Sequence, residues 1–138
     1  MSITSAELLS LARQLRDSPD EVERRASTSR LYYGLLHRAV ECLQTFDRQL
    51  QRPREATFRW VRERFLEVSS DHWHLLNALA RLKDERQHAD YDIDRYDGWS
   101  QRHIELAEEM AREVARLLDE YVVPAGSQQA LGLIEPAS

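Results

Sequence analysis

The apolar residues of this chain recur at helical spacing over most of its length, and that pattern restricts the fold more than any other feature. In the longest such stretch, from about residue 21 to residue 46, one apolar face keeps a 3.6-residue period. Glycine and proline occur only 4 times each, and most of them fall near expected helix ends or in the last residues of the chain. We therefore predict an all-α, up-and-down bundle of four to five helices with short connections.

Start and stop signals divide this pattern into five segments. Thr4 to Glu7 has the order of a capping box, and Ser18 followed by Pro19 is a typical helix start. We expect helices over about residues 5–16, 19–46, 58–68, 72–89 and 100–123, with a loop over 90–97. Residues 1–123 then form the bundle. Residues 124–138, which begin with Pro124, form a tail that is loose or docked on a partner.

The bulk properties favour one domain in a reducing compartment. A chain of 138 residues can bury a core without disulfides, and its single cysteine, Cys42, is expected to be inert core. The apolar stretches are shorter than a membrane span, and the N-terminus lacks the regions of a signal peptide. We expect a cytoplasmic protein with no membrane contact. The net charge of −5 argues against nucleic-acid binding by the whole surface, so the places where arginines cluster matter most.

The densest group of chemically active side chains lies where the fourth apolar pattern ends. Its candidate catalytic residues are Arg81, Arg86, His88, Asp90 and Tyr91. Arg81 and His88 are seven residues apart, nearly two helical turns, so they share a face. Cleavage of RNA without a metal needs a cation on the phosphate and a group that transfers protons near neutral pH, as histidine does. The structural alternative is that Arg86, Asp90 and Tyr91 tie the helix end to a loop, with His88 exposed.

Two segments resemble the motifs of a known family. The first is Arg25-Ala-Ser-Thr-Ser-Arg30-Leu-Tyr32-Tyr33-Gly-Leu-Leu-His37 on the long helix, and the second is Leu82-Lys-Asp-Glu-Arg86-Gln-His88-Ala-Asp90-Tyr91-Asp92. In this order and at this chain length they resemble the HEPN family (higher eukaryotes and prokaryotes nucleotide-binding domains). The likeness is to its small stand-alone bacterial members with an R-x-x-A-D-Y-D ending, and it covers about residues 5–122.

The resemblance implies a homodimer that forms through the long helices, with a functional cleft where two copies of the second motif meet. Many members of the family are metal-independent ribonucleases, and many of these are toxins paired with a nucleotidyltransferase antitoxin. Their active motif is an arginine, four to six residues, and a histidine. Arg81 and His88 match that spacing. Arg86 instead aligns with the arginine of the R-x-x-A-D-Y-D ending, and Tyr91 then lies where the histidine would follow.

Three functions stay open as alternatives. The first is a metal-independent endoribonuclease toxin of a toxin–antitoxin or defence system. In it Arg81 and Arg86 bind phosphate, His88 transfers protons, and Asp90 and Tyr91 orient them. The second is a non-catalytic HEPN module that binds a nucleotide or docks a partner nucleotidyltransferase. The third is a structural helical adaptor, and none of the three calls for a cofactor.

The most basic segment lies between the second and fourth predicted helices. Between residues 48 and 64 it holds six arginines and two glutamates, and its candidates for RNA or partner binding are Arg52, Arg54, Arg59 and Arg62. A solvated helix face explains these arginines equally well.

Several aromatic residues are assigned to interfaces and to the core. Tyr32, Tyr33 and His37 are expected to make packing and dimer contacts, because paired polar aromatics often hydrogen-bond across an interface. The tryptophans Trp60, Trp73 and Trp99 are expected in the core, although they also have the chemistry to stack on bases.

Two sets of metal-ligand residues have unsuitable spacing. Asp90, Asp92 and Asp94 alternate as in an EF-hand loop, but the glycine and the glutamate that such a loop needs at its sixth and twelfth positions are missing. His72 and His74 are two residues apart and so point in different directions on a helix. We therefore predict no metal site.

Overall fold

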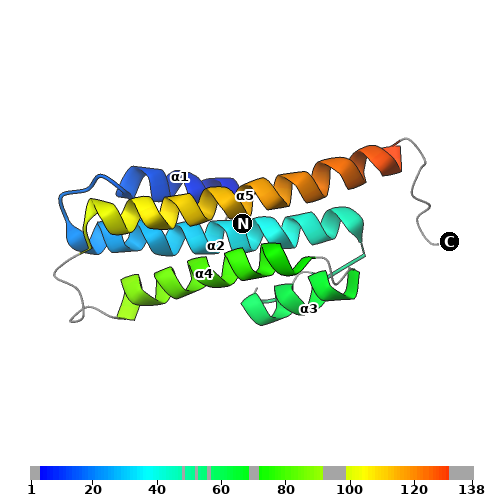
Figure 1. The fold of residues 1–138 in the computed structure, drawn as a ribbon, viewed down its shortest axis with the longest axis horizontal. Coiled ribbons are helices and arrows are strands. Elements are labelled where there is room, and N and C mark those ends of the chain that lie inside the picture. The colour runs from blue at the N-terminus through cyan, green and yellow to red at the C-terminus, as the bar shows by residue number, and fades with distance from the viewer. Residues whose placement is uncertain are drawn as a thin grey trace.

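Five helices packed together, without a strand, make up the described part of the chain, which confirms the all-α prediction. The structure is a computed structural model that describes residues 4–47, 49–51, 53–55, 57–68, 72–91 and 99–130, and of Phe46 and residues 121–130 it describes the backbone alone. The helices are α1 (Ser5–Leu15), α2 (Glu21–Phe46), α3 (Phe58–Val68), α4 (Trp73–Tyr91) and α5 (Gln101–Ala130). Figure 1 shows α2 between α4 on one side and α1 and α5 on the other, with the short α3 beside the first turns of α4.

The central helix is α2, the longest apolar repeat of the sequence analysis. It contacts each of the other four helices. Leu35, Leu36, Ala39 and Val40 on this helix are at most 1% exposed, and they share one core with the leucines of α4 and the inner residues of α3 and α5. Each buried leucine or valine side chain contributes on the order of 1.5–3 kcal/mol. Cys42 lies in the same core, as predicted, and burial raises the pKa of its thiol to about 12.

The first helix rests on α2 at a glycine. A Cβ atom at Gly34 would lie 2.8 Å from Leu9 Cδ2, so a glycine at this position lets the two helices approach closely. Arg16, directly after α1, donates two hydrogen bonds to the carboxylate of Glu108 on α5, at 2.7 and 2.8 Å. This bidentate pair fixes the end of α1 against α5 as well as α2.

The start of α2 differs from the predicted one. The helix begins after Asp20 and not at Pro19, because the Asp20 side chain accepts a hydrogen bond from the backbone N–H of Val22 and so caps the helix. Ser18 belongs to the preceding turn, where its hydroxyl oxygen accepts from the N–H of Asp20.

Two helices extend further than the sequence pattern predicted. Asp90 and Tyr91 are the last residues of α4 rather than the start of a loop, because Arg25 of α2 binds carbonyl oxygens in the last turn of α4. The rest of the predicted loop, residues 92–97, lies outside the described residues. In addition, α5 continues past Pro124 to Ala130. The assignment of residues 124–138 to a separate tail stays a prediction.

Trp99 anchors the start of α5 to the first turns of α2. Its side chain is fully buried, and its indole N–H donates to Thr28 Oγ1 at 3.1 Å. Its backbone N–H donates to Glu21 Oε1 at 2.7 Å, and its carbonyl oxygen accepts from Arg24 Nε at 2.9 Å. Polar contacts as well as burial therefore hold Trp99 against the first turns of α2.

The three tryptophans have different environments. The prediction of core tryptophans is confirmed for Trp99, and Trp60 packs partly buried against the core. It is wrong for Trp73, which is 53% exposed at the start of α4. In the part of the chain that the structure describes, no helix combines the length and the hydropathy that a membrane crossing requires.

The Trp99 anchor gives a stability prediction. Thr28→Val removes the hydroxyl that accepts the indole N–H and keeps the size of the side chain. We expect it to lower the free energy of unfolding by about 1–3 kcal/mol, because a buried donor loses this acceptor. Thr28→Ser keeps the hydroxyl and is the matched control, with an expected loss of about 1 kcal/mol or less. Urea denaturation measures both, and equal losses would show that the hydrogen bond is unimportant.

Candidate functional site

The two segments with family-like motifs meet at the end of α4. Arg25 is 6% exposed, and its Nη1 donates to the backbone oxygens of Ala89 at 2.9 Å and His88 at 3.3 Å. Carbonyl groups in the last turn of a helix lack helical partners, and the helix dipole favours a cation there. The guanidinium also lies 5.2 Å from the centre of the Trp99 ring. Arg25 therefore sets the position of the end of α4 relative to α2.

Arg86 lies among three tyrosines near the end of α4. Its guanidinium carbon is 5.6, 5.5 and 5.7 Å from the ring centres of Tyr32, Tyr33 and Tyr91, which are cation–π distances. Its Nη1 is 3.4 Å from Asp90 Oδ2, and its side chain is 12% exposed. Burial works against the charge, but Tyr33, Tyr91 and Asp90 together raise the pKa of Arg86. The residue is thus a fixed, well-compensated cation.

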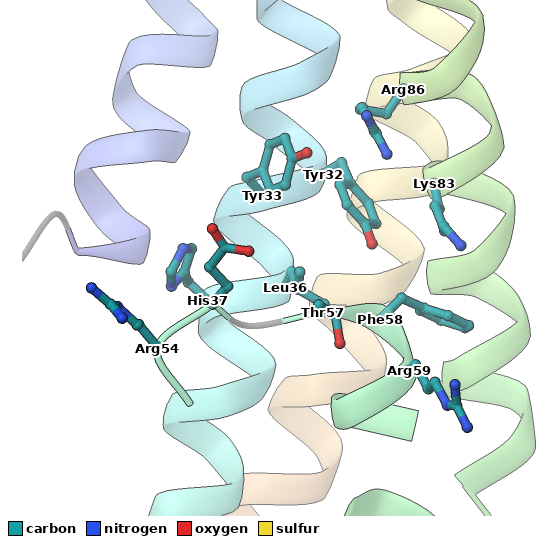
Figure 2. Close-up of a pocket in the computed structure, with 11 residues that line it drawn as sticks. Tyr32, Tyr33, Leu36, His37, Arg54, Thr57, Phe58, Arg59, Lys83 and Arg86 are labelled. Atoms are coloured by element: carbon teal, nitrogen blue, oxygen red, sulfur yellow. The ribbon is translucent and has the colours of Figure 1, made fainter. Parts of the chain in front are cut away.

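A groove of about 570 Å³ opens beside Arg86, between α2, α4 and the chain around the start of α3. It is lined by Tyr32, Tyr33, Leu36, His37, Arg54, Glu55, Thr57, Phe58, Arg59, Lys83 and Arg86. Figure 2 shows Arg86 with the two tyrosines at one end of the groove, and Arg54 and Arg59 toward the other end, where His37 also lies. Its volume is in the range of ligand pockets. We call this feature the groove.

The groove is basic although the whole chain is acidic. Among its described lining residues, Arg54, Arg59, Lys83 and Arg86 are cations and Glu55 is the one carboxylate, whereas the chain has a net charge of −5. Within the described residues, the buried Arg86 Nε has no hydrogen-bond partner. Guanidinium and ammonium groups bind phosphate, and aromatic rings stack on bases. The groove therefore suits a ligand that combines phosphates with planar rings.

Only part of the predicted catalytic group reaches the groove. Arg86 lines it, and Asp90 and Tyr91 contact Arg86, although Tyr91 is 72% exposed. Arg81 is exposed and His88 is partly buried, and neither lines the groove. α4 is continuous over both, so the shared helix face of Arg81 and His88 follows from its geometry. The catalytic roles of all five residues stay predictions.

Likewise, only part of the basic segment between residues 48 and 64 reaches the groove. Arg54 and Arg59 line the groove, and Arg59 Nε also lies 3.3 Å from Glu63 Oε1 on α3. Arg62 is exposed and does not line it, and Arg52 lies outside the described residues. The structure therefore distinguishes Arg54 and Arg59 from Arg62, whereas the sequence alone gives all three the same status.

All three residues that were predicted at a dimer interface line the groove. Tyr32 is 2% exposed, and its ring meets the Tyr33 ring edge-on at 5.2 Å between centres. His37 is partly buried. Tyr32 thus contributes mainly to the interior of its own chain, while a contribution of Tyr33 and His37 to a dimer stays a prediction.

Sequence reasoning missed two residues of the groove and one residue that supports it. Lys83 lies three residues before Arg86 on the same helix face, and this spacing was a signal that pointed to it. Phe58, whose ring is 5.2 Å from Lys83 Nζ, was given no role beyond opening the predicted helix over residues 58–68. The role of Arg25 depends on carbonyl groups more than 60 positions away in the chain, and no local pattern indicates such a contact.

Neither a metal site nor a known relative defines this groove. In the described residues, no three or more His, Cys, Asp or Glu side chains gather where they could hold a metal ion. Asp92 and Asp94 of the EF-hand-like pattern lie outside the described part. Comparison with models of protein families, with curated proteins and with solved structures gives no match to the chain. The groove is therefore the feature of the structure that indicates a function.

Tyr32, which lines the groove, gives the stability of the fold a measurable pH dependence. Burial raises the pKa of Tyr32 to about 12, although the Arg86 charge opposes this shift. A tyrosine pKa that is higher in the folded state than its unfolded value near 10 stabilises the fold fully below pH 10, and that contribution is lost as pH rises toward 12. We expect wild type to lose stability more steeply than Tyr32→Phe over this range. Urea midpoints at several pH values measure it, and the alkaline titration of Cys42 is common to both proteins. Parallel curves would contradict the assignment to Tyr32.

Proposed function

We propose that this protein binds RNA in the groove between α2, α4 and the start of α3. One observation carries the proposal: four cations gather with tyrosine and phenylalanine rings in a hollow of nucleotide size, in a chain that is acidic overall. Arg54, Arg59 and Lys83 are placed to neutralise phosphates, and Tyr33 and Phe58 to stack on bases. Arg86 adds a fixed positive charge at the inner end.

The proposal extends to an RNA-acting protein of the HEPN kind. Its support is the order of the two motifs and the contacts between them, from Arg25 to the end of α4 and from Arg86 to Tyr32 and Tyr33. As part of this proposal, the helices form an up-and-down HEPN-like bundle. Two copies pair through their long helices in the cytoplasm, and a nucleotidyltransferase antitoxin is the partner.

A second candidate function is metal-independent cleavage of the bound RNA, as in a toxin. The observation in its favour is that α4 is unbroken from Trp73 to Tyr91, so Arg81 and His88 share one helix face with Arg81 exposed. In this candidate Arg81 holds the phosphate and His88 takes the proton of the attacking 2′-hydroxyl. The 2′-oxygen bonds to phosphorus as the bond to the 5′-oxygen breaks, and the leaving 5′-oxygen takes a proton from solvent water. The non-catalytic alternative retains RNA or nucleotide binding and lacks this step.

The binding proposal predicts the effect of removing two groove cations. We expect Arg54→Ala/Arg59→Ala to weaken binding of a labelled single-stranded RNA about tenfold at 0.1 M salt. The slope of log K against log salt should fall by about 1.4, because each phosphate contact on a single strand contributes about 0.7. Fluorescence anisotropy over a salt series measures both quantities.

The matched control removes the same charge outside the groove. Arg62 and Arg112 are exposed on α3 and α5 and do not line it. We expect Arg62→Ala/Arg112→Ala to keep the affinity within about twofold, since general charge alone has a modest effect at this salt. Equal losses in the two double variants would show that the RNA contact is not localised in the groove.

The cleavage candidate predicts activity in EDTA. Wild type should cleave a mixed RNA pool without metal, His88→Ala should abolish that cleavage, and His37→Ala should retain most of it, because His37 lies in the groove and outside the Arg81–His88 face. Gel analysis of the pool with each purified protein is the measurement. If His37→Ala loses cleavage while His88→Ala retains it, the reaction takes place in the groove and not at the Arg81–His88 face. The absence of cleavage by wild type would exclude this candidate and leave binding as the function.

A further inference from the structure

A second hollow lies on the same seam between α2 and α4. It measures about 350 Å³ and is lined by Val22, Arg25, Ala26, Ser29, Arg30, Ala89 and Asp90. We call it the Arg30 hollow. Its α2 residues come directly before those of the groove, and its α4 residues come directly after them. The Arg86–Asp90 pair separates the two, since Arg86 lines the groove and Asp90 lines the Arg30 hollow.

The two hollows open on the same side of the seam. On α2, Tyr33 and His37 of the groove follow Arg30 at three and seven positions, within about 60° of it around the helix axis. On α4, Arg86 and Asp90 are four positions apart and therefore also share a face. A ligand that lies along the seam in the groove thus meets the Arg30 hollow next.

Among the described residues, the Arg30 hollow carries more positive than negative charge. Asp90 is its one lining carboxylate among the described residues, and that carboxylate is paired with Arg86 and accepts a hydrogen bond from Ser29 Oγ at 3.4 Å. In the described chain, Arg30 has no acidic partner. Arg25 is nine-tenths buried, and its Nε and Nη2 have no hydrogen-bond partner among the described residues. The nearest carboxylate oxygen, on Glu21, is 3.6 Å from Nε.

We propose that an RNA strand bound in the groove continues along the seam past Arg86 and places a further phosphate in the Arg30 hollow. This inference rests on the proposed RNA binding and names its substrate class, a strand of several nucleotides rather than a free nucleotide. The rise from Arg30 to His37 is about 10 Å, and Arg54 and Arg59 lie at the His37 end of the groove. A single nucleotide therefore cannot bridge Arg30 and these two arginines, whereas a strand of several nucleotides can.

The test compares short and long RNA in a variant of the second hollow. Arg30→Gln removes one charge from a side chain without an acidic partner, so the fold is expected to persist; Arg25 is unsuitable because it holds the end of α4. The probes are fluorescein-labelled oligouridylates of two and eight nucleotides, measured by anisotropy. We expect Arg30→Gln to weaken binding of the eight-nucleotide probe about fivefold to tenfold. Its affinity for the two-nucleotide probe should stay within about twofold of the wild-type value. Arg112→Gln, at an exposed position on α5, should leave both unchanged.

The other outcomes separate this inference from the proposed function. If Arg30→Gln binds the octamer as wild type does, while Arg54→Ala/Arg59→Ala remains impaired, the path into the Arg30 hollow is wrong and binding in the groove stands. Equal losses of affinity for the two-nucleotide and the eight-nucleotide probe would also contradict the proposed path, because Arg30 would then act on binding in the groove itself. If wild type binds neither probe, the proposed RNA binding fails and this inference fails with it.

Discussion

The hydrogen bonds from Arg25 to the carbonyl oxygens of His88 and Ala89 are the contact on which the candidate site depends. They join the beginning of α2 to the end of α4 with a buried cation, where a helix terminus has both free acceptors and a negative dipole end. Because α2 and α4 are rigid over this length, fixing one point of their seam also fixes how Arg86 stands opposite Tyr32 and Tyr33. The shape of the groove follows from that pairing.

Separation of charge gives the groove its chemical character. Acidic residues outnumber basic ones, 24 to 19, over the whole chain, yet the groove concentrates cations beside aromatic rings. Burying an arginine as deeply as Arg86 is costly unless its charge is compensated. Asp90 and the faces of three tyrosines compensate it here, and a guanidinium suits this environment because it stacks on rings and stays charged. The rim cations Arg54 and Arg59 remain solvated, although Arg59 also pairs with Glu63 on α3.

Periodicity in the sequence was enough to place the helices but not their ends. The apolar repeats correctly located α3 from Phe58 to Val68, and they placed the body of α2 although not its start. The end of α4 was placed two residues early, because Asp90 and Tyr91 look like loop residues when their partners Arg86, Ser29 and Arg25 are unknown. In the candidate site, Arg86 was found from its motif. Lys83 was passed over, although the same helix face carries both residues.

The sequence by itself determined the all-α class, the order of the helices, and the presence of cations and aromatic residues in two motifs. These are local properties, because helical periodicity and capping depend on residues a few positions apart. Tertiary structure alone decided that Arg54 and Arg59, rather than Arg62, line the same groove as Arg86, and that Tyr32 is interior. These outcomes depend on which faces of α2, α4 and the start of α3 meet. That choice is set by burial of the shared core across distant parts of the chain, which no local pattern encodes.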